Sequence, residues 1–251
     1  MASRRNDAST LKEEQQSRRQ ERADRILDAA AELVLRWGYK KTTIDDIARQ
    51  AGVAKGTIYL HWKAREDLLV ALLTREDLKL TEDIKRRIAS DPEGATLRGF
   101  VKHTTLALMK NPLMKALLLN DIEMLGEFAR REYRSATYAE RIKNFTTFLE
   151  FLRSHGVVRA DVGMREQAYI LSAVWVGFLL VDPWMPDELK FSDEKVVEML
   201  ADAVQLAIGP RTTATGEPVE TGPSQELSNA LTQYIDQDAN TIKELQKEVE
   251  A

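Results

Sequence analysis

The stretch from Thr42 to Trp62, TTIDDIARQAGVAKGTIYLHW, constrains the fold of this chain more than any other. Thr43 can cap a helix, and Asp46 three residues later can complete a capping box with it. Three apolar residues then recur at helical spacing on one face: Ile44, Ile47 and Ala48. Gly52 follows where this helix should end, because glycine adopts the left-handed conformation of a helix C-terminus without strain. The stretch therefore begins as a short, capped, amphipathic helix.

A second short helix is expected from about Lys55 through Leu60, once Val53 has buried its side chain in the turn. Its apolar face is formed by Ile58 and Trp62, which lie four residues apart. Polar side chains project from the other faces: Lys55, Thr57, Tyr59 and His61. Two such helices joined by a glycine-containing turn are typical of a helix-turn-helix, which places its second helix in the major groove of DNA. The alternative is an ordinary helical hairpin whose polar residues form a solvated face.

Residues 22–69 resemble the DNA-binding domain of the tetracycline-repressor (TetR) family of bacterial transcription regulators. The resemblance is carried by RILDAAAELVLRWGY at 25–39, by the stretch described above, and by KAREDLL at 63–69, in the family's order and without a gap. It covers about the first quarter of the chain. Two residues depart from the family pattern. Ala54 stands where a serine often caps the recognition helix, and Arg65 replaces a common lysine while keeping the charge available for a phosphate.

The resemblance also implies which residues touch DNA. It implies phosphate contacts for four residues: Thr43, Tyr59, His61 and Lys63. It places Lys55 and Thr57 near base edges or backbone, where a lysine can donate to guanine and a threonine methyl can meet thymine. Gly56 would let the recognition helix approach the DNA closely. For His61, a surface histidine with no role in binding is the alternative.

The charge distribution agrees with a DNA-binding N-terminal region. Residues 1–65 contain 14 Lys and Arg against 9 Asp and Glu, whereas residues 66–251 contain 22 against 31. The net charge of −4 therefore combines a basic first quarter with an acidic remainder. Positive charge is needed only where phosphates release their counterions, and an acidic remainder discourages indiscriminate wrapping by nucleic acid.

A polar extension precedes the motif. Thr10 and Glu13 are spaced as a capping box, so the first helix is expected to begin well before Arg22, after a frayed tail over residues 1–9. On such a helix three arginines could act as a basic arm that touches phosphate or a narrow minor groove: Arg18, Arg19 and Arg22.

Several other classes of function lack their sequence signals. The chain has no cysteine, so it has neither disulfides nor a thiol nucleophile, which fits a reducing cytoplasm. Its start is polar and carries no secretory signal, and its longest apolar run, 168–181, is too short to span a bilayer. There is no phosphate-binding glycine loop, and the three histidines have no metal-ligand spacing: His61, His103 and His155. We therefore expect a cytoplasmic protein that is not an enzyme and holds no cofactor or metal.

The rest of the chain is expected to be helical, which makes the fold all-α. The predicted helices are 66–90, 91 to about 110, 112 to about 120, 127–154, 164–181 and 193–208. Asp91 and Pro92 suit the N-cap and first position of the second of these, and Ser192 suits the N-cap of the last. No alternating strand pattern competes.

The resemblance implies a homodimer built on the last two helices of this body, 164–181 and 193–208. Small residues there would permit close approach of helices: Ser172, Ala173, Gly177, Ala201 and Ala203. A dimer would place two DNA-reading heads about one helical turn apart on a near-palindromic operator.

The resemblance also implies an effector pocket in the body. Candidate lining residues are Phe100, His103, Thr104, Met109, Met114, Leu118, Met124, Tyr138, Phe145, Phe148, Trp175 and Phe178. Met and aromatic side chains make adaptable apolar walls, so the effector would be hydrophobic or aromatic. The alternative for each residue is plain core, and for His103 a hydrogen-bonded core histidine. The expected function is a repressor released from its operator by this effector; in the alternative, the body binds a protein partner instead.

The C-terminal region departs from the family core. Residues 210–223 form a flexible linker, and 224–251 an additional helix. Its apolar residues alternate by four and three, interrupted by Asp238: Leu231, Ile235, Ile242, Leu245 and Val249. We expect this helix to dock on its own subunit or on the dimer mate. The other expected regions are an N-terminal extension (1–21), the DNA-binding domain (22–66) and the effector-binding and dimerisation domain (67–209).

Overall fold

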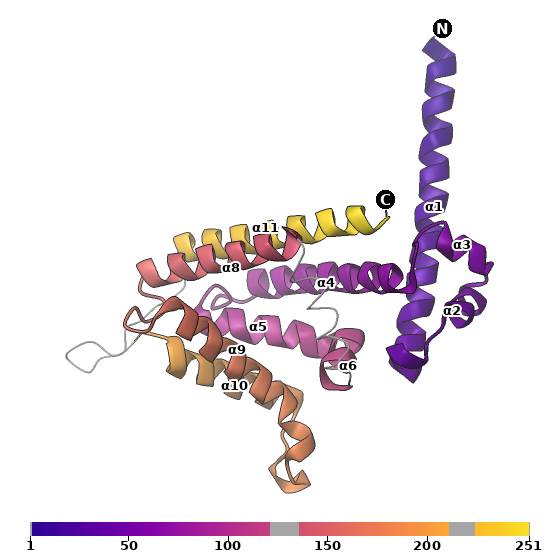
Figure 1. Ribbon diagram of the computed structural model, residues 1–251. Coiled ribbons are helices and arrows are strands. Elements are labelled where there is room, and N and C mark those ends of the chain that lie inside the picture. Colours follow the sequence, from indigo (N-terminus) through magenta and orange to yellow (C-terminus); the bar gives the residue numbers. More distant parts are fainter. Residues whose placement is uncertain (1, 121–135, 211–223, 251) are drawn as a thin grey trace. The chain divides into compact units, whose positions relative to one another are not determined.

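The computed structural model describes residues 2–120, 136–210 and 224–250, and the regular structure of this part of the chain is entirely helical (Figure 1). The all-α prediction is confirmed. Contacts divide the chain into two compact units. We call residues 1–75, with which 246–251 group, the head, and residues 76–245 the body. The division falls inside one continuous helix, α4 (Arg65–Ser90).

The head consists of α1 (Ala2–Trp37), the short 3-10 helix η1 (Tyr39–Lys41), α2 (Ile44–Ala51), α3 (Lys55–Tyr59) and the first part of α4. The prediction of a frayed tail and a helix start at Thr10 is wrong, because α1 already begins at Ala2. Residues 2–13 contain neither glycine nor proline, so nothing in them interrupts the helix. At its other end α1 stops at Gly38, whose φ of 80° suits glycine.

The core of the head is built on one face of α1. Its buried residues recur at helical spacing: Ala23, Ile26, Leu27, Ala30, Leu33 and Val34. Ile47 of α2, Ile58 of α3 and Trp62 complete this core, each almost fully buried. Burial of such side chains contributes about 1.5–3 kcal/mol each, which fixes the two short helices that could not persist alone in water.

The body contains the rest of α4, then α5 (Leu97–Lys110), α6 (Pro112–Asn120), α8 (Ala136–Ser154), α9 (Met164–Leu180), α10 (Asp193–Ile208) and α11 (Gln225–Glu250). Two 3-10 turns join α9 to α10: η2 (Asp182–Trp184) and η3 (Asp187–Leu189). The first residues of the helix predicted from 127, and the linker from 211 to 223, lie outside the described residues.

The start of α5 differs from the prediction. Asp91 does not cap a helix; one of its carboxylate oxygens accepts a hydrogen bond from the Glu93 backbone at 2.9 Å, which closes a turn. The other lies 2.8 Å from His103 Nε2. The helix begins five residues later than predicted, where the Thr96 hydroxyl accepts a hydrogen bond from Gly99 N at 2.9 Å. The carboxylate of Asp91 is thus used by a tertiary contact that sequence spacing does not reveal.

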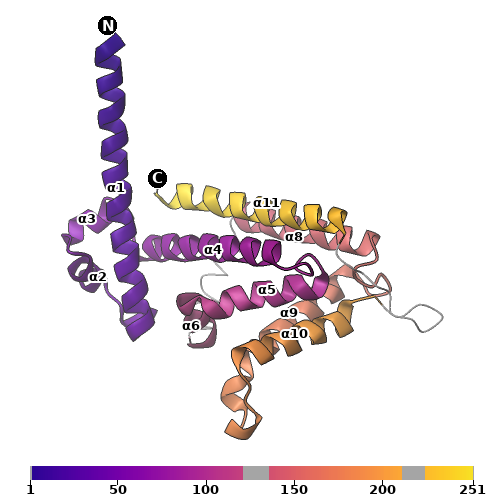
Figure 2. The ribbon, with the colours of Figure 1, turned by 180° about the vertical axis from the view of Figure 1, so that it is seen from behind.

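Helix α11 packs on the body of its own chain. In both views it runs alongside α8 (Figures 1 and 2), and Leu227, Leu231 and Ile235 belong to the main apolar core of the body. Asp238 does not simply interrupt its apolar seam. It accepts hydrogen bonds from Arg141 of α8 at 2.9 and 3.2 Å, and Arg141 also donates to Asp77 of α4 at 2.9 Å. Burial raises the pKa of Asp77, an effect that the charge of Arg141 opposes.

Candidate nucleic-acid interface

The first helix of the motif is fixed by its cap. The Thr43 hydroxyl accepts a hydrogen bond from Asp46 N at 3.2 Å, and Thr43 N donates to the Asp46 carboxylate at 3.3 Å. This is the predicted capping box. The hydrogen bonds from Thr43, followed by the charge of Arg49, lower the pKa of Asp46. The same threonine is thereby held at the start of α2 with an exposed side chain.

The turn and second helix follow the prediction closely. Gly52 ends α2 in the left-handed conformation, with φ 65° and ψ 38°, and Ala54 precedes α3 without a side-chain cap. Helix α3 ends at Tyr59, one residue before the predicted end, and Val53 is half-buried instead of buried. Ile58 and Trp62 anchor the helix to the core, so its other faces are directed outward.

The residues predicted to contact DNA gather on this outward surface. Five are exposed, namely Thr43, Lys55, Gly56, Tyr59 and Lys63, and two are partly buried, namely Thr57 and His61. Tyr59 is 46% exposed although it is aromatic, and the neighbouring Leu60, which was not among the predicted contacts, is 74% exposed. A Cβ added to Gly56 would meet nothing within 4 Å, so the fold itself does not require glycine there.

Lys55 has a partner inside the motif. Its Nζ lies 2.8 Å from a carboxylate oxygen of Asp45 on α2. The hydrogen bond with Asp45, and then its charge, raise the pKa of Lys55. Both side chains are exposed, so Lys55 can exchange this carboxylate for an acceptor on DNA.

Arg65 is held within the head. Its guanidinium lies 4.0 Å from the centre of the Tyr39 ring and donates a hydrogen bond to the Tyr39 carbonyl. The sequence predicted that Arg65 keeps its charge for a phosphate. In the free protein that charge is stacked on an aromatic ring instead.

The three arginines of the predicted arm do not share one environment. Burial lowers the pKa of His61, and the positive charges of Arg19 and then Arg22 lower it further. Arg19 also lines a groove together with His61. Arg18 is an exposed residue of the same helix but does not line that groove.

The sequence of the head matches the profile of a known family, bacterial regulatory proteins of the tetR family, over residues 26–72. The head therefore carries the DNA-binding domain of the TetR family. The match covers the helix-turn-helix and the helices on either side of it. TetR-family proteins are transcription regulators that bind DNA.

Two curated TetR-family relatives illustrate the extent of the similarity. The fatty acid metabolism regulator protein of Bacillus subtilis is 43% identical over 67 residues, which is 25% of this chain and 34% of that protein. The transcriptional repressor KstR of Mycolicibacterium smegmatis is 27% identical over 191 residues, 75% of this chain and 88% of that protein. The match to the Bacillus subtilis protein is therefore higher in identity but short, whereas the match to KstR is lower in identity and extends into the body.

A solved structure supports the same fold. SmeT, the repressor of the Stenotrophomonas maltophilia multidrug efflux pump SmeDEF, has been solved in complex with triclosan. That complex aligns with a TM-score of 0.55 and 20% identity, covering 81% of this chain and 98% of the SmeT chain. The similarity in fold to SmeT thus extends over most of this chain and is not confined to the head.

The residues expected to line an effector pocket fall into three groups. Five belong to the apolar core of the body or pack against it: Phe100, Phe145, Phe148, Trp175 and Phe178. Four others lie on α5 and α6 and are buried or partly buried: His103, Thr104, Met109 and Met114. Met124 and the side chains of Leu118 and Tyr138 lie outside the described part of the chain.

A residue of α11, Tyr234, packs against the aromatic residues Phe100 and Phe148 of this set. The Tyr234 ring stacks on Phe148 with centroids 4.7 Å apart and an angle of 7°, and it meets Phe100 edge-on at 6.3 Å. Phe100 and Phe148 also meet edge-on at 5.8 Å. Burial raises the pKa of Tyr234, so its hydroxyl stays protonated. A side chain of the protein itself occupies the face of Phe148 on which an aromatic ligand would stack.

His103 is a buried histidine with a partner, as one of the two alternatives predicted. Its Nε2 lies 2.8 Å from Asp91, while Nδ1 and the neighbouring Thr104 hydroxyl have no hydrogen-bond partner among the described residues. Trp175 also has a hydrogen-bond partner within the body, because its indole N–H donates to the Thr105 hydroxyl at 3.0 Å.

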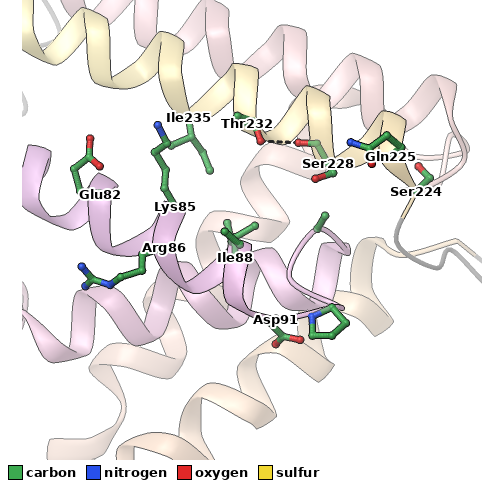
Figure 3. Close-up of a pocket in the computed structure, with 13 residues that line it drawn as sticks. Glu82, Lys85, Arg86, Ile88, Asp91, Ser224, Gln225, Ser228, Thr232 and Ile235 are labelled. Carbon is green, nitrogen blue, oxygen red and sulfur yellow. Dashed lines mark hydrogen bonds between the residues drawn. The ribbon is translucent and has the colours of Figure 1, made fainter.

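A recess of about 720 Å³ lies between α4, the turn after it and the start of α11 (Figure 3). Its wall mixes charged and polar residues, such as Glu82, Arg86 and Gln225, with apolar ones such as Ile88 and Ile235. Lys85 in this wall is paired with Asp236 of α11 at 2.5 Å. The recess is a poor match for a hydrophobic effector, which favours apolar walls.

The surfaces predicted for dimerisation are only partly accessible. Ala201 is fully buried in the core of its own subunit, so its predicted role at an interface is wrong; α10 uses that face against α5 and α9. The small residues of α9 are exposed: Ser172, Ala173 and Gly177. Large apolar residues accompany them, with Tyr169 77% and Leu206 86% exposed. No described helix is long and apolar enough to cross a membrane.

Proposed function

We propose that the head binds a specific DNA operator through the exposed face of α3 and the start of α2. The observation that carries this proposal is the anchored helix α3: Ile58 and Trp62 are buried, while Lys55, Gly56 and Tyr59 face outward. Base contacts would come from Lys55 and Thr57, and phosphate contacts from Thr43, Tyr59, His61 and Lys63. Gly56 carries no side chain where the helix must approach the groove.

We propose further that the active form is a homodimer joined through α9 and α10. The exposed Tyr169, Ala173, Val176 and Gly177 recur on one side of α9, and Leu206 is exposed on α10. These two apolar surfaces would be covered by their copies in a second subunit. Two heads would then read the two halves of a near-palindrome, which adds the modest affinities of two short helices.

Regulation would take the form of repression that a hydrophobic or aromatic small molecule relieves. KstR is named a repressor and SmeT has been solved with triclosan, which supports a ligand of this kind for the body. Helix α4 contributes residues to both head and body, so it can couple a ligand to DNA binding. A coupling of about 1–3 kcal/mol would change DNA affinity about 5- to 150-fold.

A protein partner for the body is the second candidate. The aromatic cluster is already filled by Tyr234, whereas the connection between α9 and α10 exposes Trp184, Leu189 and Phe191. Exposed apolar patches of this kind mark interaction surfaces. Thermal unfolding in the presence of a set of hydrophobic small molecules separates the two: a concentration-dependent rise in Tm supports a ligand, and no rise for any compound supports a partner.

Selection of bound fragments from random and genomic DNA by the purified protein tests DNA recognition directly. Enrichment of a near-palindrome supports a dimeric regulator. Failure of any fragment to enrich over the input library would contradict specific DNA recognition by this head.

A further inference from the structure

A groove of about 410 Å³ runs between the N-terminal half of α1 and the residues that follow α3. Among the described side chains it is lined by Gln15, Gln16, Arg19, Gln20, Ala23 and His61. Those on α1 are spaced by three and four residues, so they form one face of the helix. In both views α3 lies beside α1, and α1 continues past it (Figures 1 and 2). The groove is thus continuous with the surface proposed to read DNA.

The groove carries positive charge that the protein does not neutralise. None of these described lining residues is acidic, and no ion pair joins Arg19 or Arg22 to a carboxylate in the part of the chain that the structure describes. Two acids that flank the arginines on α1, Glu21 and Asp24, accept 3.4 Å hydrogen bonds from Ser17 and Gln20. Burial of His61, and then the charges of Arg19 and Arg22, lower the pKa of that histidine.

The recess in the body provides a contrast. Its cations are matched by acids of the protein, Lys85 by Asp236 and Arg86 by Asp83. A site whose charges are already paired gains little from an incoming ion. Arg19 in the groove on the head lacks such a partner among the described residues, so an anion bound there would be attracted by Arg19 and by the nearby Arg22.

We propose that this groove is a second DNA-contact site, which binds a backbone phosphate with Arg19, Gln16 and His61 as donors. The proposal rests on operator binding by α3. Arginine and glutamine side chains offer N–H donors that suit phosphate oxygens, and the location beside α3 supplies the phosphates of the same duplex. The contact adds affinity without sequence preference and lengthens the footprint of each head beyond the base pairs that α3 reads.

The test compares wild type, Arg19→Gln and Arg25→Gln on the selected operator and on a scrambled duplex over a range of salt concentrations. Arg25 is an exposed residue of α1 about 240° around the helix from Arg19, so its substitution removes the same charge from another face. Arg19→Gln is expected to weaken binding to both duplexes several-fold. The slope of log affinity against log salt concentration should become shallower by about 0.9, because one phosphate contact is lost. Arg25→Gln should keep the wild-type slope, and Arg19→Lys should restore most of it.

Operators with a neutral methylphosphonate at one position at a time locate the contact. A position at which wild type loses affinity and Arg19→Gln does not is the phosphate held in the groove. Circular dichroism verifies that each variant remains folded, which is expected because both arginines are exposed. Equal salt slopes for wild type and Arg19→Gln, or equal losses for the two arginine variants, would overturn the second site. Absence of operator selection by wild type would instead overturn the proposed function itself.

Discussion

At the residue scale, Thr43 serves two purposes with one hydroxyl. It caps α2 through Asp46 and is proposed to contact a phosphate. We predict that Thr43→Ala lowers the free energy of unfolding by about 1 kcal/mol, as expected for loss of an N-cap, and weakens operator binding in addition. Thr43→Ser keeps the hydroxyl and should match wild type in both measurements. Urea unfolding followed by circular dichroism, and operator titration of the folded variants, separate the two effects.

The ion pair between Asp45 and Lys55 predicts a loss of selectivity when it is removed. In Asp45→Asn, Lys55 no longer has to break an ion pair before it contacts DNA, and the surface proposed to face DNA loses one negative charge. Affinity for scrambled DNA should rise several-fold and by a larger factor than affinity for the operator. Gel-shift titrations on the two duplexes measure the ratio. Asp28→Asn, which removes a carboxylate paired with Arg75 on another part of the head, serves as the matched control.

His61 predicts a pH dependence of DNA binding. Burial, Arg19 and Arg22 lower its pKa in the free protein, and a bound phosphate would raise it again. Binding therefore takes up a proton, so affinity should increase as pH falls from above the bound-state pKa to below the free-state pKa. The ratio of the affinities at the two ends of the titration measures how far the pKa differs between the two states. Operator titrations between pH 5.5 and 8 should show no such pH dependence for His61→Gln. A variant with the same pH profile as wild type would rule out His61 as the source of the dependence.

At the element scale, the sequence predicted a helix correctly where a capping residue and the spacing of the apolar residues indicate the same boundaries. Helix α10 has the predicted start, end and Ser192 cap, and α2 has its capping box and glycine end. Prediction failed at α5, because Asp91 is used by a turn and by His103, a residue twelve positions away. It failed for Ala201 because small residues suit both a dimer interface and a tight subunit core. The groove glutamines escaped notice since their alignment with Arg19 depends on an uninterrupted α1.

Helix α11 predicts an effect on ligand binding. The substitution Tyr234→Ala removes the ring that covers Phe148 and Phe100. It should lower the free energy of unfolding by about 2–4 kcal/mol, close to the effect of replacing a core aromatic residue by alanine. If the pocket lies there, small aromatic compounds should bind the variant more tightly than wild type and raise its Tm more. Tyr234→Phe keeps the ring and should behave as wild type. Equal Tm shifts for the alanine variant and wild type would place any effector elsewhere.

At the scale of the whole molecule, the exposed apolar surfaces of α9 and α10 predict a dimer. A charge introduced by Leu206→Glu should be destabilising only at an interface, because this side chain is 86% exposed in the single subunit. The variant should sediment as a monomer, keep its helical content, and lose most of its operator affinity since one head loses the contribution of the other. Leu206→Met should remain dimeric. A Leu206→Glu variant that sediments like wild type would direct the search for the interface to another surface.

The contact between Asp45 and Lys55 also bears on how such a protein finds its operator. On random DNA, a lysine that remains with its own carboxylate contributes little attraction, and the carboxylate repels nearby phosphates. Only an acceptor as well placed as a guanine edge would draw the lysine away. If Lys55 reads a base edge as proposed, residence on incorrect sequences would be shortened, and a genome that offers millions of competing sites would retain fewer copies of the protein away from its target.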